Sequence, residues 1–293
     1  MKKKKLSSDR IFAASVMLPA IIFLGTVFYY PFFKNIYFMF HKYNYVSKPQ
    51  FVGLDNIKQL FGDASAARAF MNTFQITVIS VPLVLFVSLV LAISVFNVRF
   101  GKNFLKSAFF TTYLVPSVVA SVIFKLMFGT ELGFVNSVLG GMGIGKIAWL
   151  SKPLLAKLCI VIVHIWNGTG YYMLIFFAGL SNVDFQLYEA ARVDGAGTIS
   201  QFFHVTLPQL KPTIIFSALY ATISYLKTYV IVQVLTEGGP YGATETAIKL
   251  IFDQGFTSRN VGYASVLAIA LFLIILGVTG IQMAASKRMS GED

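Results

Sequence analysis

Hydrogen-bonding side chains gather in two stretches of this chain that are otherwise apolar enough to lie in a membrane. Within 213–234 these side chains are Ser217, Tyr220, Thr222, Ser224, Tyr225, Lys227, Thr228, Tyr229 and Gln233. Within 154–178 the apolar residues are interrupted by Asn167-Gly168-Thr169-Gly170-Tyr171-Tyr172. Because polar groups are costly in hydrocarbon, these residues are predicted to face a cavity or the interior of a helix bundle. Hydroxyl, amide and ammonium groups beside aromatic rings suit the reversible binding of a polar molecule.

Covalent or metal chemistry has no comparable set of residues. Cys159 is the single cysteine, and the three histidines are scattered without ligand spacing: His41, His164 and His204. His164 is interpreted as an interhelical hydrogen-bonding residue. Residues 140–146 (GGMGIGK) fit the glycine and lysine part of a P-loop, but Ile147 stands where Ser or Thr should hold magnesium. No metal site and no bound cofactor is therefore predicted for this chain.

The composition indicates a membrane protein. The 293 residues are 56% hydrophobic and 12% charged, with a mean hydropathy of +0.72. This leaves too little polar surface for a soluble globule. The net charge of +12 raises the question of nucleic-acid binding, but the basic residues lie at the ends of apolar runs and in loops. That placement fits membrane topology, and no nucleic-acid partner is predicted.

Six apolar runs predict an all-α, polytopic membrane protein with one transmembrane domain over 1–293. The predicted spans are 11–31, 72–96, 108–128, 154–178, 213–234 and 261–283. The first run is longer than the apolar part of a usual signal peptide and no cleavage site follows it, so it is predicted to be retained. Basic residues beside the N-terminus, in the loop 98–106 and at Lys287-Arg288 predict that both termini are cytoplasmic.

The longest polar segment between two spans is 184–212. Asp184 is predicted to cap a short amphipathic helix, and Gly195–Gly197 to break that helix, because glycine allows a positive φ. Thr198 with the glutamine three residues later forms a capping-box pattern for a second short helix, which Pro208 is predicted to limit. Two short helices around a glycine turn at the membrane surface predict a docking element.

This segment resembles the EAA loop of permease subunits of binding-protein-dependent ABC importers. The matching residues are Glu189, Ala190, Ala191, Asp194, Gly195, Ala196, Phe203, Leu207, Pro208 and Pro212. In that family the loop is the coupling helix that sits in a cleft of a cytosolic ATPase. The resemblance therefore implies a role in ATPase coupling for Glu189, Ala190, Ala191, Asp194, Gly195, Ala196 and Pro208. It also implies that Glu189 approaches an ATPase arginine and that Gly195 permits the turn.

Glu189, Gly195 and the segment as a whole also have simpler interpretations than ATPase coupling. Glu189 has the spacing for an i,i+3 ion pair with Arg192, and Gly195 is also compatible with an ordinary helix stop. The whole segment is also compatible with an interfacial hairpin that has no protein partner.

Two further elements resemble the carbohydrate branch of the same family. They are FVGLDN at 51–56, after the first span, and LTEGGP at 235–240, after the fifth span. The resemblance implies a sugar permease related to those for maltose, multiple sugars and glycerol phosphate, in a bacterial or archaeal cytoplasmic membrane. It implies a second, non-identical permease, two ATPases that carry the ATP and magnesium, and an extracytoplasmic binding protein. The chain itself is then not an enzyme.

In that family the solute-binding residues lie in the helices just before and after the EAA loop. Matched by distance from Glu189, they fall on Asn167, Gly168, Tyr171, Ser224, Tyr225 and Thr228. Lys227 lies among them and is added because an ammonium group in a membrane needs a partner or water. Only Gly168 and Tyr171 match the maltose-type pattern, so a different sugar is predicted. The alternative role for these side chains is interhelical hydrogen bonding.

The sequence is also compatible with two other functions. The first is an ABC permease for a non-sugar or phosphorylated solute, such as a glycerol phosphate. The second belongs to another class, a stand-alone channel or a membrane enzyme. An enzyme would need a converging set of metal ligands or nucleophiles, which the sequence does not show, and a channel would need no ATPase.

Overall fold

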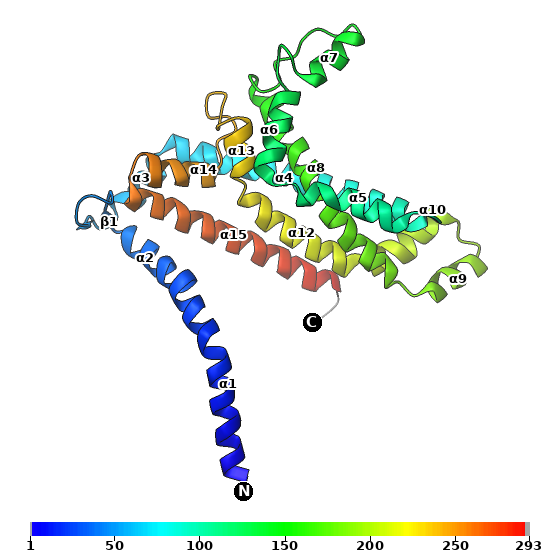
Figure 1. Ribbon diagram of the computed structural model, residues 1–293, viewed down its shortest axis with the longest axis horizontal. Coiled ribbons are helices and arrows are strands. Elements are labelled where there is room, and N and C mark those ends of the chain that lie inside the picture. Colours follow the sequence, from blue (N-terminus) through cyan, green and yellow to red (C-terminus); the bar gives the residue numbers. More distant parts are fainter. Residues whose placement is uncertain (1, 291–293) are drawn as a thin grey trace. The chain divides into compact units, whose positions relative to one another are not determined.

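The computed structural model describes residues 2–290 and places side chains from Phe12 to Lys287 (Figure 1). The chain is mainly helical, which confirms the helical class predicted from the apolar runs. Its contacts divide it into two compact units, Met1–Asp63 with Ile251–Phe272, and Ala64–Leu250 with Leu273–Asp293. The predicted cytoplasmic positions of Met1 and Asp293 lie outside the described residues.

Four helical stretches of the described chain are long and apolar enough to cross a membrane. The first, Phe12–Phe38, passes from α1 (Lys2–Leu24) through the π-helical turn η1 (Gly25–Tyr29) into α2 (Tyr30–Phe38), beyond the predicted end at 31. The others are α4 (Ala64–Asn97), α8 (Pro153–Ser181) and α15 (Val261–Ser290). These three helices contain the second, fourth and sixth predicted spans.

The third predicted span, 108–128, is not one straight helix. It consists of α5 (Lys102–Leu114) and α6 (Ser117–Met127), which meet at a bend of 89°. Pro116 explains the bend, because proline has no N–H to donate and its ring clashes with the preceding helical turn. The bent pair is a fifth candidate span.

The fifth predicted span, 213–234, is also interrupted. α12 (Lys211–Leu226, 16 residues) ends before Lys227, and α13 (Val230–Leu235, 6 residues) begins after Tyr229. Each piece is too short to cross a membrane alone. The described residues therefore contain four candidate spans, or five with the bent pair, and the count of six stays a prediction.

The first unit shows what the FVGLDN element does locally. Strands β1 (His41–Lys42) and β2 (Gln50–Phe51) form an antiparallel hairpin, which leads into α3 (Asp55–Gly62). Asn56 Nδ2 donates to the carbonyls of Met39 and His41, at 3.0 and 3.1 Å. The buried asparagine of the element therefore fastens the start of α3 to the hairpin.

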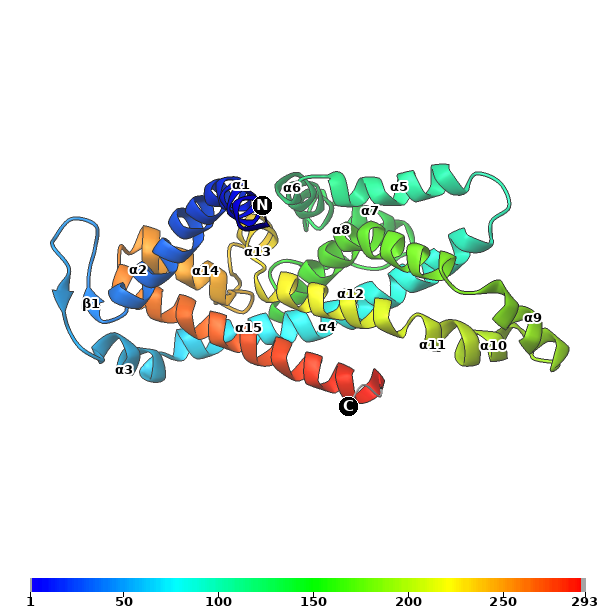
Figure 2. The same ribbon diagram turned by 90° about the horizontal axis from the view of Figure 1, so that it is seen from below.

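Helix α8 is the centre of the second unit, where it packs against α4 and α5 while α12 packs against α4 (Figure 2). The face of α4 that meets these neighbours carries mostly small, buried side chains at helical spacing: Ala69, Thr73, Ile76, Ser80, Val84, Ser88 and Ala92. Small residues let helices approach closely in a membrane. Ser88 Oγ adds a hydrogen bond to the carbonyl of Thr169 at 3.1 Å.

The remaining elements are short. Between α6 and α8 lies α7 (Phe134–Gly141), and after α13 come α14 (Ala247–Phe252) and the π-helical turn η3 (Asp253–Thr257). The segment after α8 contains α9 (Phe185–Val193), α10 (Thr198–Gln201), the π-helical turn η2 (Phe202–Thr206) and α11 (Leu207–Gln209).

Candidate functional site

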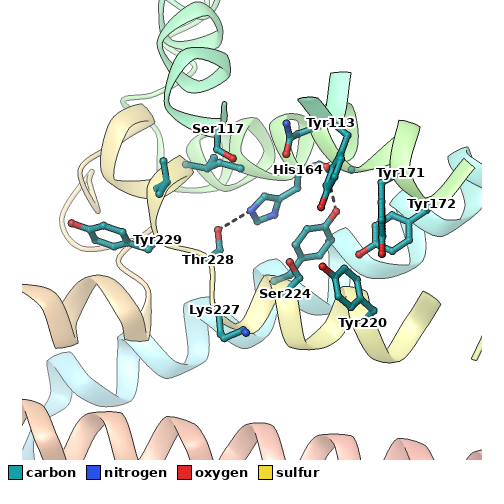
Figure 3. Close-up of a pocket in the computed structure, with 15 residues that line it drawn as sticks. Tyr113, Ser117, His164, Tyr171, Tyr172, Tyr220, Ser224, Lys227, Thr228 and Tyr229 are labelled. Atoms are coloured by element: carbon teal, nitrogen blue, oxygen red, sulfur yellow. Dashed lines mark hydrogen bonds between the residues drawn. The ribbon is translucent and has the colours of Figure 1, made fainter. Parts of the chain in front are cut away.

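Both helix breaks open onto one cavity in the second unit, with a volume of about 230 Å³ (Figure 3). Interrupted helices leave backbone groups without helical partners, so in membrane proteins they are found where they line a cavity or are buried in protein. All seven residues predicted to bind a solute line this cavity: Asn167, Gly168, Tyr171, Ser224, Tyr225, Lys227 and Thr228. Their role in binding stays a prediction, and their positions show what each side chain can do.

Tyrosine rings form one wall of the cavity (Figure 3). Tyr171 stacks on Tyr113 with ring centroids 4.7 Å apart, and its other neighbours are Tyr172 at 5.1 Å and Tyr220 at 5.4 Å. These rings come from α5, α8 and α12. The cluster offers flat apolar faces with hydroxyl groups at their edges, a surface suited to the C–H face and hydroxyls of a sugar ring.

Asn167 stabilises the bend between α5 and α6. In a continuous helix the carbonyl of Thr112 would accept from residue 116, but Pro116 has no N–H. Asn167 Nδ2 replaces that donor at 3.1 Å from the Thr112 carbonyl, and lies 3.4 Å from the carbonyl of Val115. The amide hydrogens of Asn167 are therefore used within the protein, which leaves its Oδ1 for a ligand.

His164 joins three elements at the cavity wall. Its Nδ1 lies 3.1 Å from Ser80 Oγ on α4, and its Nε2 lies 2.8 Å from Thr228 Oγ1 in the break after α12. Tyr225 Oη donates to the His164 carbonyl at 3.2 Å, and the two rings stack with centroids 4.5 Å apart. The interhelical hydrogen-bonding role predicted for His164 is confirmed.

Gly168 makes this packing possible. A Cβ atom at position 168 would lie 2.6 Å from Tyr225 Oη. Gly168 and Tyr225 therefore build the wall, and the hydroxyls of Tyr225 and Thr228 are already bonded within the protein. For these two residues and for the amide hydrogens of Asn167, the alternative role of interhelical bonding is the one observed.

Ser224 and Lys227 are the predicted residues with exposed side chains at the cavity. Lys227 follows the last turn of α12, where its backbone N–H donates to the Ser224 carbonyl at 3.2 Å. The ammonium of Lys227 and the hydroxyl of Ser224 therefore both line the cavity near the break. Among the described residues the Lys227 side chain makes no ion pair, so the alternative role of interhelical bonding is not observed for it within this chain, while a bond to a partner permease stays a prediction.

The first half of the EAA-like segment folds as its sequence predicts. Asp184 Oδ1 accepts from the backbone N–H of Gln186 at 2.9 Å and caps α9. Gly195 ends the turn with a φ of +78°, and Ala196 N donates to the Ala191 carbonyl at 2.8 Å. Positive φ is the conformation that favours glycine, so Gly195 sets the angle between the two short helices.

The second half departs from the prediction in two ways. Gly197 is the N-cap of α10, with no side-chain cap, and Gln201 Nε2 donates to the Ala196 carbonyl at 2.8 Å, so the predicted capping box is wrong. The turn at Gly195 leaves that carbonyl free, and it takes the glutamine donor. Pro208 does not end the helix either, because it lies near the start of α11, directly after the π-helical turn η2. Proline is tolerated in a first helical turn.

The ion pair proposed as a simpler role for Glu189 is not observed. The Arg192 guanidinium lies over the Phe185 ring, 5.5 Å from its centroid, and Glu189 is exposed without an ion-pair partner in the described part of the chain. Large apolar side chains of the same segment are also exposed, including Val193 at 88% and Ile199 at 77%. An exposed carboxylate among exposed apolar side chains is a surface suited to a protein partner.

The sequence predicted that Tyr172, Tyr220 and Tyr229 face a cavity or the bundle interior, but it gave them no solute-binding role. It gave none either to the other lining residues Tyr113, Ser117, His164, Val230 and Ile231. Tyr220 had a usable signal, since it precedes Ser224 by four residues and therefore shares its helical face. Tyr113 had none, because only the bend at Pro116 brings α5 to the cavity.

Together these features define a class of protein. A multi-pass membrane chain with interrupted helices around a polar cavity, and with an exposed pair of short helices between two membrane helices, has the organisation of a transport subunit. The chain belongs to the family of binding-protein-dependent transport system inner membrane components, whose model matches residues 84–291. It is a permease subunit of the ABC transporter class and not itself an enzyme.

Relatives place the chain among sugar permeases. It is 34% identical over 278 residues to the sulfoquinovosyl glycerol transport system permease protein SmoG of Agrobacterium fabrum, covering 94% of this chain and 90% of SmoG. It is 31% identical over 292 residues to the arabinooligosaccharides transport system permease protein AraP of Bacillus subtilis, covering 98% and 91%. The predicted membership of the carbohydrate branch is confirmed.

A solved structure supports the fold. With a TM-score of 0.87 and 19% identity, the chain matches a chain of a bacterial ABC transporter involved in the import of the acidic polysaccharide alginate. The match covers 98% of this chain and 99% of that one. The chain is therefore a multi-pass cell-membrane protein with an ABC permease fold.

Proposed function

We propose that this chain is one of two non-identical permeases of an importer that moves an oligosaccharide into the cytoplasm by ATP-driven alternating access. The observation that carries this proposal is the single cavity onto which both broken helices open, lined by tyrosine rings and hydroxyl groups. Alternating access about a site of this kind is the general logic of transporters with discontinuous helices.

The energy source in this proposal lies outside the chain. Two cytosolic ATPases bind ATP and magnesium, and an extracytoplasmic binding protein delivers the sugar. The exposed surface of α9 and α10 around Glu189 supports ATPase docking, since it combines a free carboxylate with exposed apolar side chains. On docking, ATP-dependent movement of the ATPases is transmitted through α9 to α8 and α12, which line the cavity.

The sugar pathway is tested at Tyr171, whose ring touches three other tyrosines. Tyr171→Ala is expected to lower uptake of the transported sugar about tenfold, because an aromatic contact contributes about 0.5–1.5 kcal/mol beyond its buried area. Tyr171→Phe keeps the ring and is expected to retain most activity. The measurement is uptake of labelled oligosaccharides and of glycerol 3-phosphate by the complete transporter in proteoliposomes.

Phe86→Ala is the matched control, since Phe86 is an aromatic residue of α4 that does not line the cavity and is exposed. It is expected to change uptake by about twofold or less. Normal uptake of every transported sugar by Tyr171→Ala would exclude this cavity as the pathway. Uptake of glycerol 3-phosphate but of no oligosaccharide would replace the proposed solute.

Membrane topology is tested by single cysteines on a Cys159→Ser background, where the native cysteine is fully buried. Tyr241→Cys, at a position 92% exposed beside the LTEGGP element, is expected to react with an impermeant thiol reagent outside sealed cells. Ala196→Cys is expected to react only after the membrane is opened, because the basic N-terminal end and loop 98–106 predict a cytoplasmic coupling segment. Labelling of position 196 from outside would reject this orientation.

A further inference from the structure

The charged side chain that lines the cavity is a cation. Lys227 is a lining residue, and within residues 12–287 no aspartate or glutamate lines the cavity with it. The other hydrogen-bonding side chains that line the cavity are hydroxyls, the Asn167 amide and the His164 imidazole, none of which is an anion. The lining therefore has a net positive charge that its own side chains do not balance.

Three exposed lysines of the described chain show a contrasting arrangement. Lys58, Lys125 and Lys146 each pair with a carboxylate, on Asp55, Glu237 and Glu131 respectively. Lys227 has no such carboxylate within residues 12–287, and its side chain stays exposed at the cavity. A lysine within a membrane segment is costly unless it meets water, a counter-charge or a ligand.

A neutral sugar does not require this arrangement. Its hydroxyl groups both donate and accept hydrogen bonds, so a neutral carbohydrate is served by hydroxyl and amide groups such as those of Ser224 and Asn167. An ammonium only donates, and its bond to an anionic oxygen is stronger than its bond to a hydroxyl. Because no carboxylate of residues 12–287 lines the cavity, an anionic ligand meets no charge repulsion from these side chains.

We infer that the transported solute is an acidic sugar, carrying a carboxylate, sulfonate or phosphate, and that Lys227 binds its anionic group. The inference rests on the proposed function, according to which the solute is a sugar, and it adds that this sugar is acidic. In this arrangement the anionic group lies at the break between α12 and α13, within reach of the Ser224 hydroxyl. The rings of Tyr113 and Tyr171 then contact the apolar face of the same sugar.

The test uses the complete transporter in proteoliposomes with four labelled probes. Trigalacturonate, a sulfonated hexose and glucose 6-phosphate carry the three candidate anions, and methyl-esterified trigalacturonate keeps the sugar without its charge. Wild type is expected to take up at least one anionic probe. Lys227→Met is expected to lower that uptake about tenfold to a hundredfold, because a hydrogen bond to a charged group is lost. Lys227→Arg keeps the charge and is expected to retain most of the uptake.

Lys157→Met is the matched control, because Lys157 is also a membrane-segment lysine but bonds to Gln75 Oε1 at 2.7 Å, away from the cavity. It is expected to keep wild-type uptake. The amount of each variant in the membrane is measured by immunoblot. If Lys227→Met does not insert, Lys227→Gln, which removes the charge but keeps a donor, takes its place with the same expected loss.

Several results would overturn the inference. Uptake of the neutral probe alone, or equal loss of neutral and anionic uptake in Lys227→Met, would show that Lys227 does not bind the anionic group of the solute. Unchanged anionic uptake in Lys227→Met would show the same. The proposed function of sugar import would be unaffected. Uptake of no sugar of either class would instead overturn the proposed function on which the inference depends.

Discussion

Replacement of Glu189 by alanine is expected to reduce sugar uptake at least about thirtyfold while the subunit still inserts in the membrane. The size of this loss follows from truncating one partner of a charge pair in an interface, which costs about 2–5 kcal/mol. Glu189 lies in α9 with its side chain exposed, so its removal leaves no buried group unpaired within the subunit. Folding should therefore be spared and coupling lost.

The measurement combines three readouts on the complete transporter: uptake, ATP hydrolysis stimulated by the binding protein, and co-purification of the ATPase. Glu131→Ala is the matched control, since Glu131 is an exposed glutamate that pairs with Lys146 at the surface, and such pairs contribute little. Normal uptake together with normal stimulated ATP hydrolysis in Glu189→Ala would contradict the assignment of this segment to ATPase coupling.

Gly195 gives an independent and smaller test of the same segment. A Cβ atom at this position would meet nothing within 4 Å, so Gly195→Asp meets no steric block and strains only the backbone, at a φ of +78°. That strain is about 1–2 kcal/mol for a side-chain-bearing residue. Reduced coupling with normal membrane abundance is expected, because the strained turn changes the angle between α9 and α10.

Replacement of Gly170 by alanine is expected to destabilise the subunit itself. Gly170 lies where α8 meets α5, and a Cβ atom there would collide with the backbone carbonyl of Phe109 and come within 3.0 Å of Phe110 Cα. Because the obstacle is backbone, neither helix can relieve the contact by rotating a side chain, and α5 and α8 must separate. Overpacking of this kind costs about 1–3 kcal/mol and occasionally more.

The expected result is a melting temperature lower by about 5 °C or more for the purified subunit in detergent. Gly277→Ala on α15 is the matched control, since a Cβ atom at that position would meet nothing within 4 Å and alanine favours the helix. Gly168→Ala is expected to fall between the two, because its obstacle is the movable hydroxyl of Tyr225. Equal melting temperatures for Gly170→Ala and Gly277→Ala would show that α5 and α8 do not pack as described.

The features that the sequence determined by itself are those whose causes are local. Apolar runs located α4, α8 and α15, because burial of a helix in lipid depends on the composition of that segment alone. Asp184 as a helix cap and Gly195 as a left-handed turn were predictable in the same way, since their causes lie within a few residues. The family was recognisable from motifs of this local kind.

The details of the cavity were decided by contacts between segments far apart in the sequence. No proline or glycine stands at the break after α12. Thr228 Oγ1 bonds to His164 Nε2 at 2.8 Å, and the Thr228 carbonyl accepts from Thr246 Oγ1 at 3.0 Å. These long-range bonds replace helical ones and stabilise the break.

The same reason explains which predicted side chains remain free for a ligand. The types of Asn167, Tyr225 and Lys227 show that each can form hydrogen bonds, but not with what partner. Only the packing of α5, α8 and α12 shows that the Asn167 amide is used at the bend and the Tyr225 hydroxyl at a neighbouring carbonyl. The same packing leaves the Lys227 ammonium exposed at the cavity. A hydrogen-bonding group is satisfied by its neighbours in space, and the tertiary structure sets these neighbours.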